Sequence, residues 1–207
     1  MNNPLRGSAI SGTVTPLGWR YVLGGLQTAV AVTSLARAAE VATRIATAGG
    51  GDLRVDLRRD GVLLCLPGPD VAAARRISSV VTDLGLRTAP GTHRSVQAIE
   101  IAIDALDIPS IRPFWQAVTG YVQEGADLVD PLGQSPPIWF QQLDQPRPQR
   151  NRVHLDISVA HDEAPRRIER ATAAGGVLRS DSSAPAFWVL ADAEGNEACV
   201  STWQGRD

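Results

Sequence analysis

Two short segments in the second half of the chain carry side chains that could do acid–base chemistry. Glu100 lies in segment 96–104, whose alternation places isoleucines on one face and Glu100 with Asp104 on the other. His154 and Asp156 likewise share the polar face of segment 153–159. A carboxylate and an imidazole that face one cavity could act as base and acid, or could grip a polar ligand. Alternatively, Glu100 pairs with an arginine, and His154 is a structural histidine bonded to Asp156 or to the backbone.

Cysteine and lysine usage limits the other chemistry. Cys65 and Cys199 each lie in an apolar, strand-like segment, so we expect two buried free thiols and no disulfide. All 20 basic residues are arginine, which excludes a lysine Schiff base. The other two histidines, His93 and His161, lie at loop or strand ends, where we expect them to be solvated.

Length and charge restrict the class of protein. A chain of 207 residues suits two small domains, each with its own core. The formal charge of −2, with acids and bases interspersed, offers no basic face for nucleic acid and no polybasic segment for a membrane. There is no apolar run of membrane-spanning length and no signal-peptide pattern at the start. The sequence predicts a cytoplasmic protein without nucleic-acid or membrane partners.

The first half predicts an antiparallel sheet with two helices on one face. Its elements are a strand at 25–32, a helix at 35–48, a hairpin at 53–66 and a second helix from about 70 to 84. Strands that form hairpins, with helices between them, are typical of a two-layer α+β domain. We place this domain at residues 13–93.

Segment 18–66 resembles the pterin-4a-carbinolamine dehydratases, through Gly18-Trp19-Arg20-Tyr21, the helix that contains Arg44-Ile45 and the hairpin. The activity of that family depends on a pair of histidines after the first helix and another after the hairpin. Here Gly49-Gly50-Gly51-Asp52 and Leu66-Pro67-Gly68 stand at those places. Without a group that titrates near neutral pH, we expect this domain to be an inactive structural or oligomerising unit, which could support a homodimer.

The second half, residues 94–207, repeats one pattern twice. A strand at 96–104 leads to a helix capped by Ser110 and then to three strand candidates, which end near 143. After a linker at 144–151, a strand at 153–159, a helix at 163–174 and three more strands follow. Two copies indicate an internal duplication of a βαβββ module, at about 95–143 and 152–203.

Three segments give this half a family resemblance. They are Phe114-Trp115-Gln116-Ala117-Val118-Thr119-Gly120-Tyr121, Asn151-Arg152-Val153-His154-Leu155-Asp156 and Asp192-Ala193-Glu194-Gly195-Asn196-Glu197. They resemble glyoxalase-like members of the vicinal-oxygen-chelate superfamily, in the right order. The resemblance implies paired modules around a concave small-molecule pocket that contains both Glu100 and His154. The whole arrangement resembles a fusion found in actinobacteria.

In metal-binding relatives, four ligands come from the first and last strands of the two modules. The matching positions here are Glu100, Gln141, His154 and Cys199. This set mixes oxygen donors with a thiol that is more typical of a core residue, so we expect no metal, with a divalent ion as the alternative.

Aromatic residues could contribute to the same pocket. Trp139 shares a strand face with Gln141 and could offer a flat surface to a ligand, as could Trp188. The alternative for both tryptophans is ordinary core packing.

Three functions follow from these patterns. The first is an enzyme of the lyase, isomerase or cyclisation type, in which Glu100 and His154 act as base and acid and Asp156 assists or orients the histidine. The second is a protein that binds a small molecule without turning it over, as resistance proteins of this superfamily do. The third, disfavoured by the missing histidines, is pterin-4a-carbinolamine dehydratase activity.

Overall fold

The chain forms two compact units, Met1–Ala98 and Ile99–Asp207. The computed structural model describes residues 7–92, 94–147 and 149–205, so His93 lies outside the described residues. In these ranges no helix is both long enough and apolar enough to cross a lipid bilayer.

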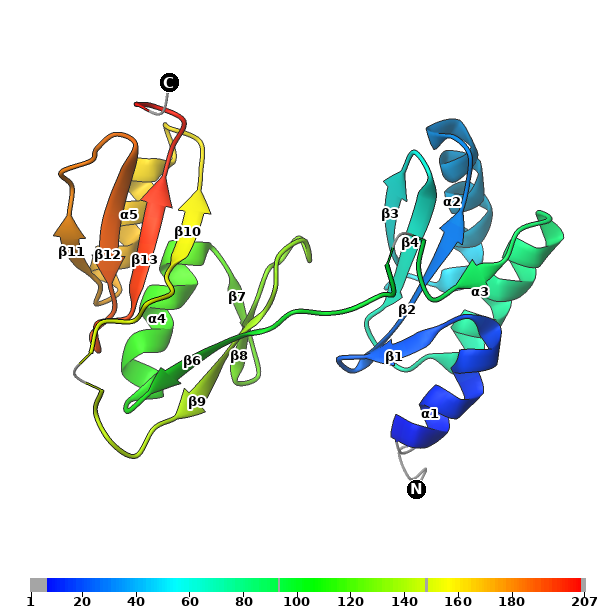
Figure 1. Cartoon of the computed structure of the whole chain (residues 1–207), viewed down its shortest axis with the longest axis horizontal. Helices are drawn as coiled ribbons and strands as arrows, with labels where there is room; N and C mark the ends of the chain where they lie inside the picture. Colours follow the sequence, from blue (N-terminus) through cyan, green and yellow to red (C-terminus); the bar gives the residue numbers. More distant parts are fainter. Residues whose placement is uncertain (1–6, 93, 148, 206–207) are drawn as a thin grey trace. The chain divides into compact units, whose positions relative to one another are not determined.

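The first unit is a five-stranded antiparallel sheet with its helices packed on one face (Figure 1). The strands follow the order β1-β2-β4-β3, and a short β5 pairs with β2 beside β1. Its elements are α1 (Gly7–Val14), η1 (Thr15–Leu17), β1 (Arg20–Val22), β2 (Gly25–Ala31), α2 (Leu35–Gly49), β3 (Arg54–Arg58), β4 (Gly61–Leu66), α3 (Val71–Asp83) and β5 (Thr88–Ala89).

Local signals in the sequence account for most of these elements. Ser34 and Asp70 cap α2 and α3 by accepting hydrogen bonds from backbone N–H groups in the first turn. The predicted strand, both helices and the hairpin are therefore confirmed. The pattern did not predict α1, whose sequence is mostly small and polar but which buries Ile10 and Val14 against the core.

The Gly18-Trp19 pair has a structural role in this unit. Gly18 has φ +80°, and a Cβ there would lie 2.2 Å from the carbonyl oxygen of Thr88. Trp19 is fully buried, and its Nε1 donates a hydrogen bond to Oγ of Ser78 at 2.9 Å. The hydroxyl of buried Thr28 lies 2.9 Å from the carbonyl oxygens of both Gly18 and Ala89. This part of the quoted motif therefore holds the sheet edge together.

The second unit contains two modules with the same path, as the internal duplication predicts. In each module the first strand pairs in parallel with the last, and the sheet order is first, fourth, third, second. Module one consists of β6 (Ile101–Ala105), α4 (Ile108–Thr119), β7 (Val122–Glu124), β8 (Asp127–Val129) and β9 (Ile138–Gln142). Module two consists of β10 (Leu155–Ser158), α5 (Ala164–Ala173), β11 (Val177–Ser180), β12 (Phe187–Ala191) and β13 (Glu197–Ser201).

Two predictions about module one are wrong in detail. The first strand begins at Ile101, so Glu100 precedes it instead of lying in its middle. The partner of the first strand, β9, begins only after Pro136 and Pro137. Because proline has no backbone N–H to donate, the ladder does not extend back to Glu100. In addition, Asp107 rather than Ser110 caps α4, and its carboxylate accepts a hydrogen bond from the Ser110 N–H.

The core of the second unit surrounds α4. This helix lies between the two sheets in Figure 1 and packs against α5. Four of its side chains are buried, namely Ile111, Phe114, Trp115 and Val118. They pack with strand residues of both modules, including Ile138 and Val200, so the modules share one hydrophobic core.

Candidate functional site

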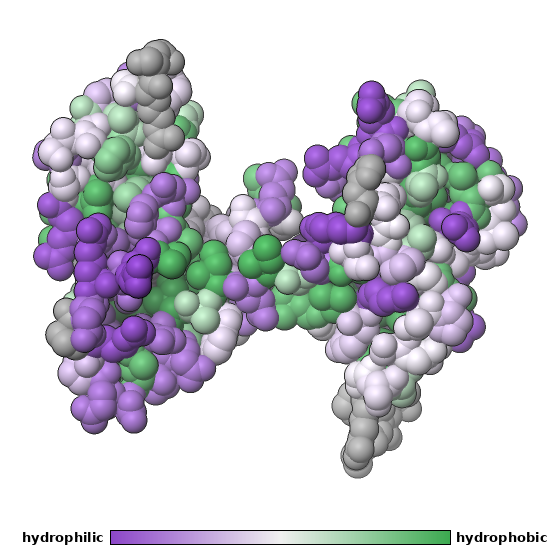
Figure 2. Space-filling view, in the orientation of Figure 1, coloured by the Kyte–Doolittle hydropathy of each residue, from purple (hydrophilic) through white to green (hydrophobic). Residues whose placement is uncertain are grey.

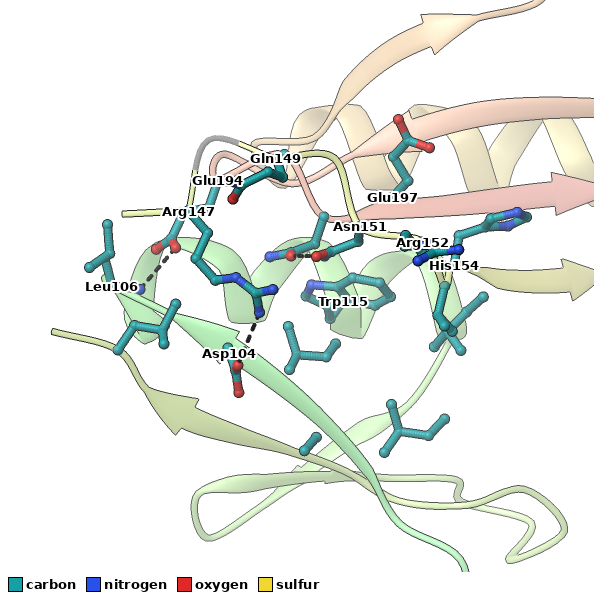
Figure 3. A pocket seen from close by; sticks show the side chains of 18 of the residues that line it. Asp104, Leu106, Trp115, Arg147, Gln149, Asn151, Arg152, His154, Glu194 and Glu197 are labelled. Atoms are coloured by element: carbon teal, nitrogen blue, oxygen red, sulfur yellow. Dashed lines mark hydrogen bonds and ion pairs between the residues drawn. The ribbon is translucent and has the colours of Figure 1, made fainter. Parts of the chain in front are cut away.

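A pocket of about 570 Å³ opens between the two modules of the second unit. Its walls come from β6, from the residues that lead into β10, from the connecting segment after β9 and from the turn between β12 and β13 (Figure 3). Trp115 of α4 lies between these walls. In Figure 2 the surface in this area is apolar, with hydrophilic side chains along its border. The pocket therefore combines an apolar interior with a polar rim, as small-molecule sites usually do.

A buried hydrogen bond ties the two modules together beneath the pocket. Trp115 Nε1 donates to Oδ2 of Asp192 at 2.9 Å, and Asp192 is only 1% exposed. The Asp192 carboxylate also accepts the backbone N–H groups of Glu194 and Asn196, each at 2.9 Å. A buried carboxylate must be satisfied in this way, so Asp192 fixes both the β12–β13 turn and its position against α4.

Glu194, at the tip of the same turn, joins module two to the start of α4. Its carboxylate accepts the backbone N–H groups of Leu106 and Asp107, at 2.8 and 2.7 Å. These donors lie at the N-terminal end of the helix, where a negative charge is favourable. Glu194 thus holds one wall of the pocket.

The remaining charges of the pocket differ in how firmly they are paired. Arg150 forms hydrogen bonds with both carboxylate oxygens of Glu197, at 2.6 to 3.0 Å. Arg147 lies 3.8 Å from Asp104, and both side chains are largely exposed, which makes this a loose surface pair. Arg152 has no hydrogen bond or ion pair with any residue that the structure describes.

His154, Asp156 and Cys199 form a polar group at one end of the pocket. Because Asp156 pairs with Cys199 in the parallel β10–β13 ladder, their side chains emerge on the same face. His154 Nδ1 lies 3.0 Å from Oδ1 of Asp156 and 3.7 Å from Sγ of Cys199. Burial, and then the neighbouring Asp156, raise the pKa of the Cys199 thiol to about 11, so it is protonated near neutral pH.

The four-ligand metal site implied by the family is not assembled by these residues. His154 and Cys199 are close together, but Glu100 belongs to no cluster of candidate ligands in the described ranges. The group that could hold an ion is instead His154, Asp156 and Cys199, whose ligand atoms lie within 4.8 Å of one another. Since the thiol would have to lose its proton first, this group is a poor fit to the expected chelate.

Within the described ranges, the other predicted site residues are not among those that line the pocket, although Trp139 and Gln141 pair with Ala102 and Asp104 of the β6 wall. Glu100 and Gln141 are exposed, and Trp139 is half-buried on the same face of β9 as Gln141. Trp188 packs against the shared core. None of these four is among the described residues that line the pocket, whereas His154 is. Their catalytic and binding roles stay predictions.

Sequence reasoning missed the residues that shape the pocket. Trp115, Asp192 and Glu194 were part of the quoted motifs, but no local pattern indicated that they contact one another. Arg152 also lay in a quoted motif, but Asp156 follows four residues later, so no sequence signal indicated that this arginine would lack a partner.

Comparison with protein families decides the class of the second unit. Residues 100–201 match the family model described as "Glyoxalase-like domain". This segment is a glyoxalase-like domain. The resemblance predicted for the second half is therefore confirmed, whereas the resemblance of the first half to pterin dehydratases stays a prediction. A comparison with curated proteins gives no match.

Solved structures with similar folds cover about half of this chain. One is hypothetical protein SA1046 from S. aureus, with 12% identity, 53% of this chain and 95% of that chain covered, and a TM-score of 0.43. A second is a glyoxalase/bleomycin resistance protein/dioxygenase family enzyme from Burkholderia phytofirmans PsJN, with 18% identity, coverages of 50% and 95%, and a TM-score of 0.41. A third is the fosfomycin resistance protein FosX from Listeria monocytogenes, in complex with Mn(II) and a dihydroxypropylphosphonic acid, with 13% identity, coverages of 49% and 86%, and a TM-score of 0.41.

Proposed function

We propose that the glyoxalase-like domain binds a small organic molecule in the pocket between its modules, and that this binding is its function. The observation that carries the proposal is the pocket itself, whose volume of about 570 Å³ suits a small molecule. Its walls come from both modules, and the buried Trp115–Asp192 bond fixes them relative to each other. A wall that is fixed in advance loses little conformational entropy when a ligand binds.

We favour binding over acid–base turnover because only one of the two expected catalytic groups is among the described residues that line the pocket. His154 lies on the pocket wall, but Glu100 is exposed before β6 and is not among the described lining residues. Glu194 and Glu197, which do line the pocket, are engaged by backbone N–H groups and by Arg150. Both carboxylates thus hold parts of the domain together. A lyase, isomerase or cyclisation activity therefore stays a prediction, as does pterin dehydratase activity.

Filling the pocket tests the proposal. Ala102 lies on the β6 wall, and Ala102→Trp would place an indole in the cavity. The probe is N-phenyl-1-naphthylamine, a neutral fluorophore whose emission rises in apolar surroundings. We expect the substitution to weaken binding of this probe by tenfold or more, a change of about 1.4 kcal/mol.

The matched control is Ala126→Trp, which adds the same indole in the exposed turn between β7 and β8. It should bind the probe as the unmodified chain does, and circular dichroism should show that both variants fold. Equal probe affinity in Ala102→Trp and Ala126→Trp would contradict the proposed function.

A further inference from the structure

The charges around the pocket are unequally compensated, and the carboxylates are the ones already satisfied. Glu194 accepts two backbone N–H groups, and Glu197 is held by Arg150. Both carboxylates already have structural partners, and these partly offset the negative charge that a cationic ligand group would meet. Glu194 and Glu197 therefore stabilise the pocket walls through these hydrogen bonds.

Asp104, the third acidic residue, is engaged by a cation of the pocket itself. Arg147 Nη1 lies 3.8 Å from Oδ2 of Asp104, which is too far for a hydrogen bond. The two side chains are 62% and 43% exposed, and a pair of this kind contributes little to stability. An anionic ligand could therefore draw Arg147 away from Asp104 at small cost.

Arg152 is the cation that remains. Its guanidinium has no hydrogen bond or ion pair with another described residue, although it lies on the pocket wall. Figure 3 shows Arg147 and Arg152 on either side of Trp115. Both come from the segment that connects the modules, and a guanidinium presents paired N–H donors that match carboxylate and phosphoryl oxygens.

We propose that the ligand of this pocket is a small organic anion, whose carboxylate, sulfonate or phosphoryl group is bound by Arg152 with help from Arg147. This assignment rests on the proposed binding function and names its ligand class. The rest of the ligand is apolar, because Ile101, Ile103 and Leu155 line the same pocket. Arg152 holds the anionic group, and burial of the apolar body supplies the remaining affinity.

A matched pair of fluorescent probes tests the charge preference in the full chain. N-Phenyl-1-naphthylamine and 1-anilinonaphthalene-8-sulfonate share one ring system and differ by a single sulfonate. We expect the sulfonate to bind more tightly than the neutral probe at low salt, and we expect this advantage to shrink as salt increases. Only the part of the binding that Ala102→Trp abolishes is counted, which excludes probe bound elsewhere.

Three substitutions assign the preference to residues. Arg152→Gln should weaken the sulfonate about tenfold and leave the neutral probe within about twofold. Asp104→Asn should tighten the sulfonate, because it removes a competing negative charge and frees Arg147. Arg166→Gln is the control, since Arg166 is also exposed but lies on α5, outside the pocket lining. It should change neither affinity.

The outcomes separate this inference from the proposed function. In one outcome, Ala102→Trp abolishes binding of both probes, the unmodified chain binds the two probes equally well, and Arg152→Gln changes neither affinity. The anion assignment is then wrong and the binding function stands. An Arg152→Gln variant that weakens both probes equally would also overturn the assignment, because its effect would then be on pocket shape. If Ala102→Trp changes neither probe, the proposed function itself fails.

Discussion

The two modules of the glyoxalase-like domain follow the same path but bury different side chains. In both, the first and last strands pair in parallel and the sheet order is identical. However, α4 of module one buries four large side chains, whereas α5 buries only Ala164 and Ala171. Glu163, just before α5, forms ion pairs with Arg167 and Arg170 of that helix, and Arg167 also donates to the Val118 carbonyl of α4. A duplicated path therefore does not require a duplicated core, because one large helix can anchor both copies.

Module one supplies the larger buried helix, but module two supplies the polar side chains that hold the modules together. Module two provides Asp192 and Glu194, which hold module one in place, and it also contains the His154, Asp156 and Cys199 group at or beside β10 and β13. Module one supplies the apolar anchor, Trp115. The difference teaches that each copy has specialised: one supplies most of the buried volume, and the other supplies most of the fixed polar contacts.

The largest expected effect comes from removing the shared anchor. Trp115→Ala deletes a buried ring and leaves Asp192 without one of its donors, so we expect the free energy of unfolding to fall by about 3 to 5 kcal/mol. Urea unfolding followed by circular dichroism measures this loss. Trp203→Ala, at a tryptophan that is 61% exposed, should cost less than about 1 kcal/mol. Equal losses in both variants would break the comparison, because α4 would then not be the common anchor.

The polar group of module two should have a distinct pH signature. Burial raises the pKa of Cys199 from 9.0 to about 11, so its thiolate fraction at pH 8 is roughly a hundredfold below that of an ordinary thiol. In the Cys65→Ser background, alkylation by iodoacetamide should reach half its maximal rate near pH 11 in the folded chain and near pH 9 in urea. A folded-state midpoint near pH 9 would show that the thiol is solvated.

The same shift has a consequence for stability. The folded chain holds the Cys199 proton more tightly than the unfolded chain does, because its pKa is raised on folding. Stability from this group is therefore complete below pH 9 and is lost as the pH rises toward 11. Between pH 9 and pH 11 the free energy of unfolding should therefore fall less steeply in Cys199→Ala than in the unmodified chain.

The smallest effect is expected at the contact between Glu194 and the start of α4. Glu194→Ala removes the acceptor of two backbone N–H groups and should lower the free energy of unfolding by about 1 kcal/mol. Glu194→Gln keeps one acceptor oxygen and should lose less. Glu169→Ala, at an exposed position of α5, is the control and should be nearly neutral. If Glu194→Ala and Glu169→Ala lose equally little free energy of unfolding, the Glu194 contact does not help to hold the two modules together.

Local signals predicted most of the fold. The hairpin of β3 and β4 follows from alternating residues and the Asp60-Gly61 turn, and α2 follows from its apolar period and the Ser34 cap. Helix α1 escaped prediction because its stability comes from packing Ile10 and Val14 against the core, not from its own sequence. The position of Glu100 was wrong because the start of β6 depends on the prolines that come just before its partner strand, β9.

The candidate site was less accessible to sequence reasoning. Its main tie joins Trp115 to a carboxylate 77 residues away, and a tryptophan on an apolar helix face has the same local pattern whether or not its N–H finds such a partner. His154 could be placed on the pocket wall because strand alternation and the family resemblance agreed. Arg152 became informative only when the partners of the neighbouring charges were known. The homodimer and the cytoplasmic location stay predictions.

The segment between β9 and β10 contributes Arg147, Gln149, Asn151 and Arg152 to the pocket but belongs to neither module. These four side chains are exposed, so substituting them should change little of the packing that holds the domain together. The proposed anion preference and the packing of the domain thus depend on different stretches of the chain. Related proteins could evolve new ligand specificities through substitutions in the segment between β9 and β10, with no change in the core that the two modules share.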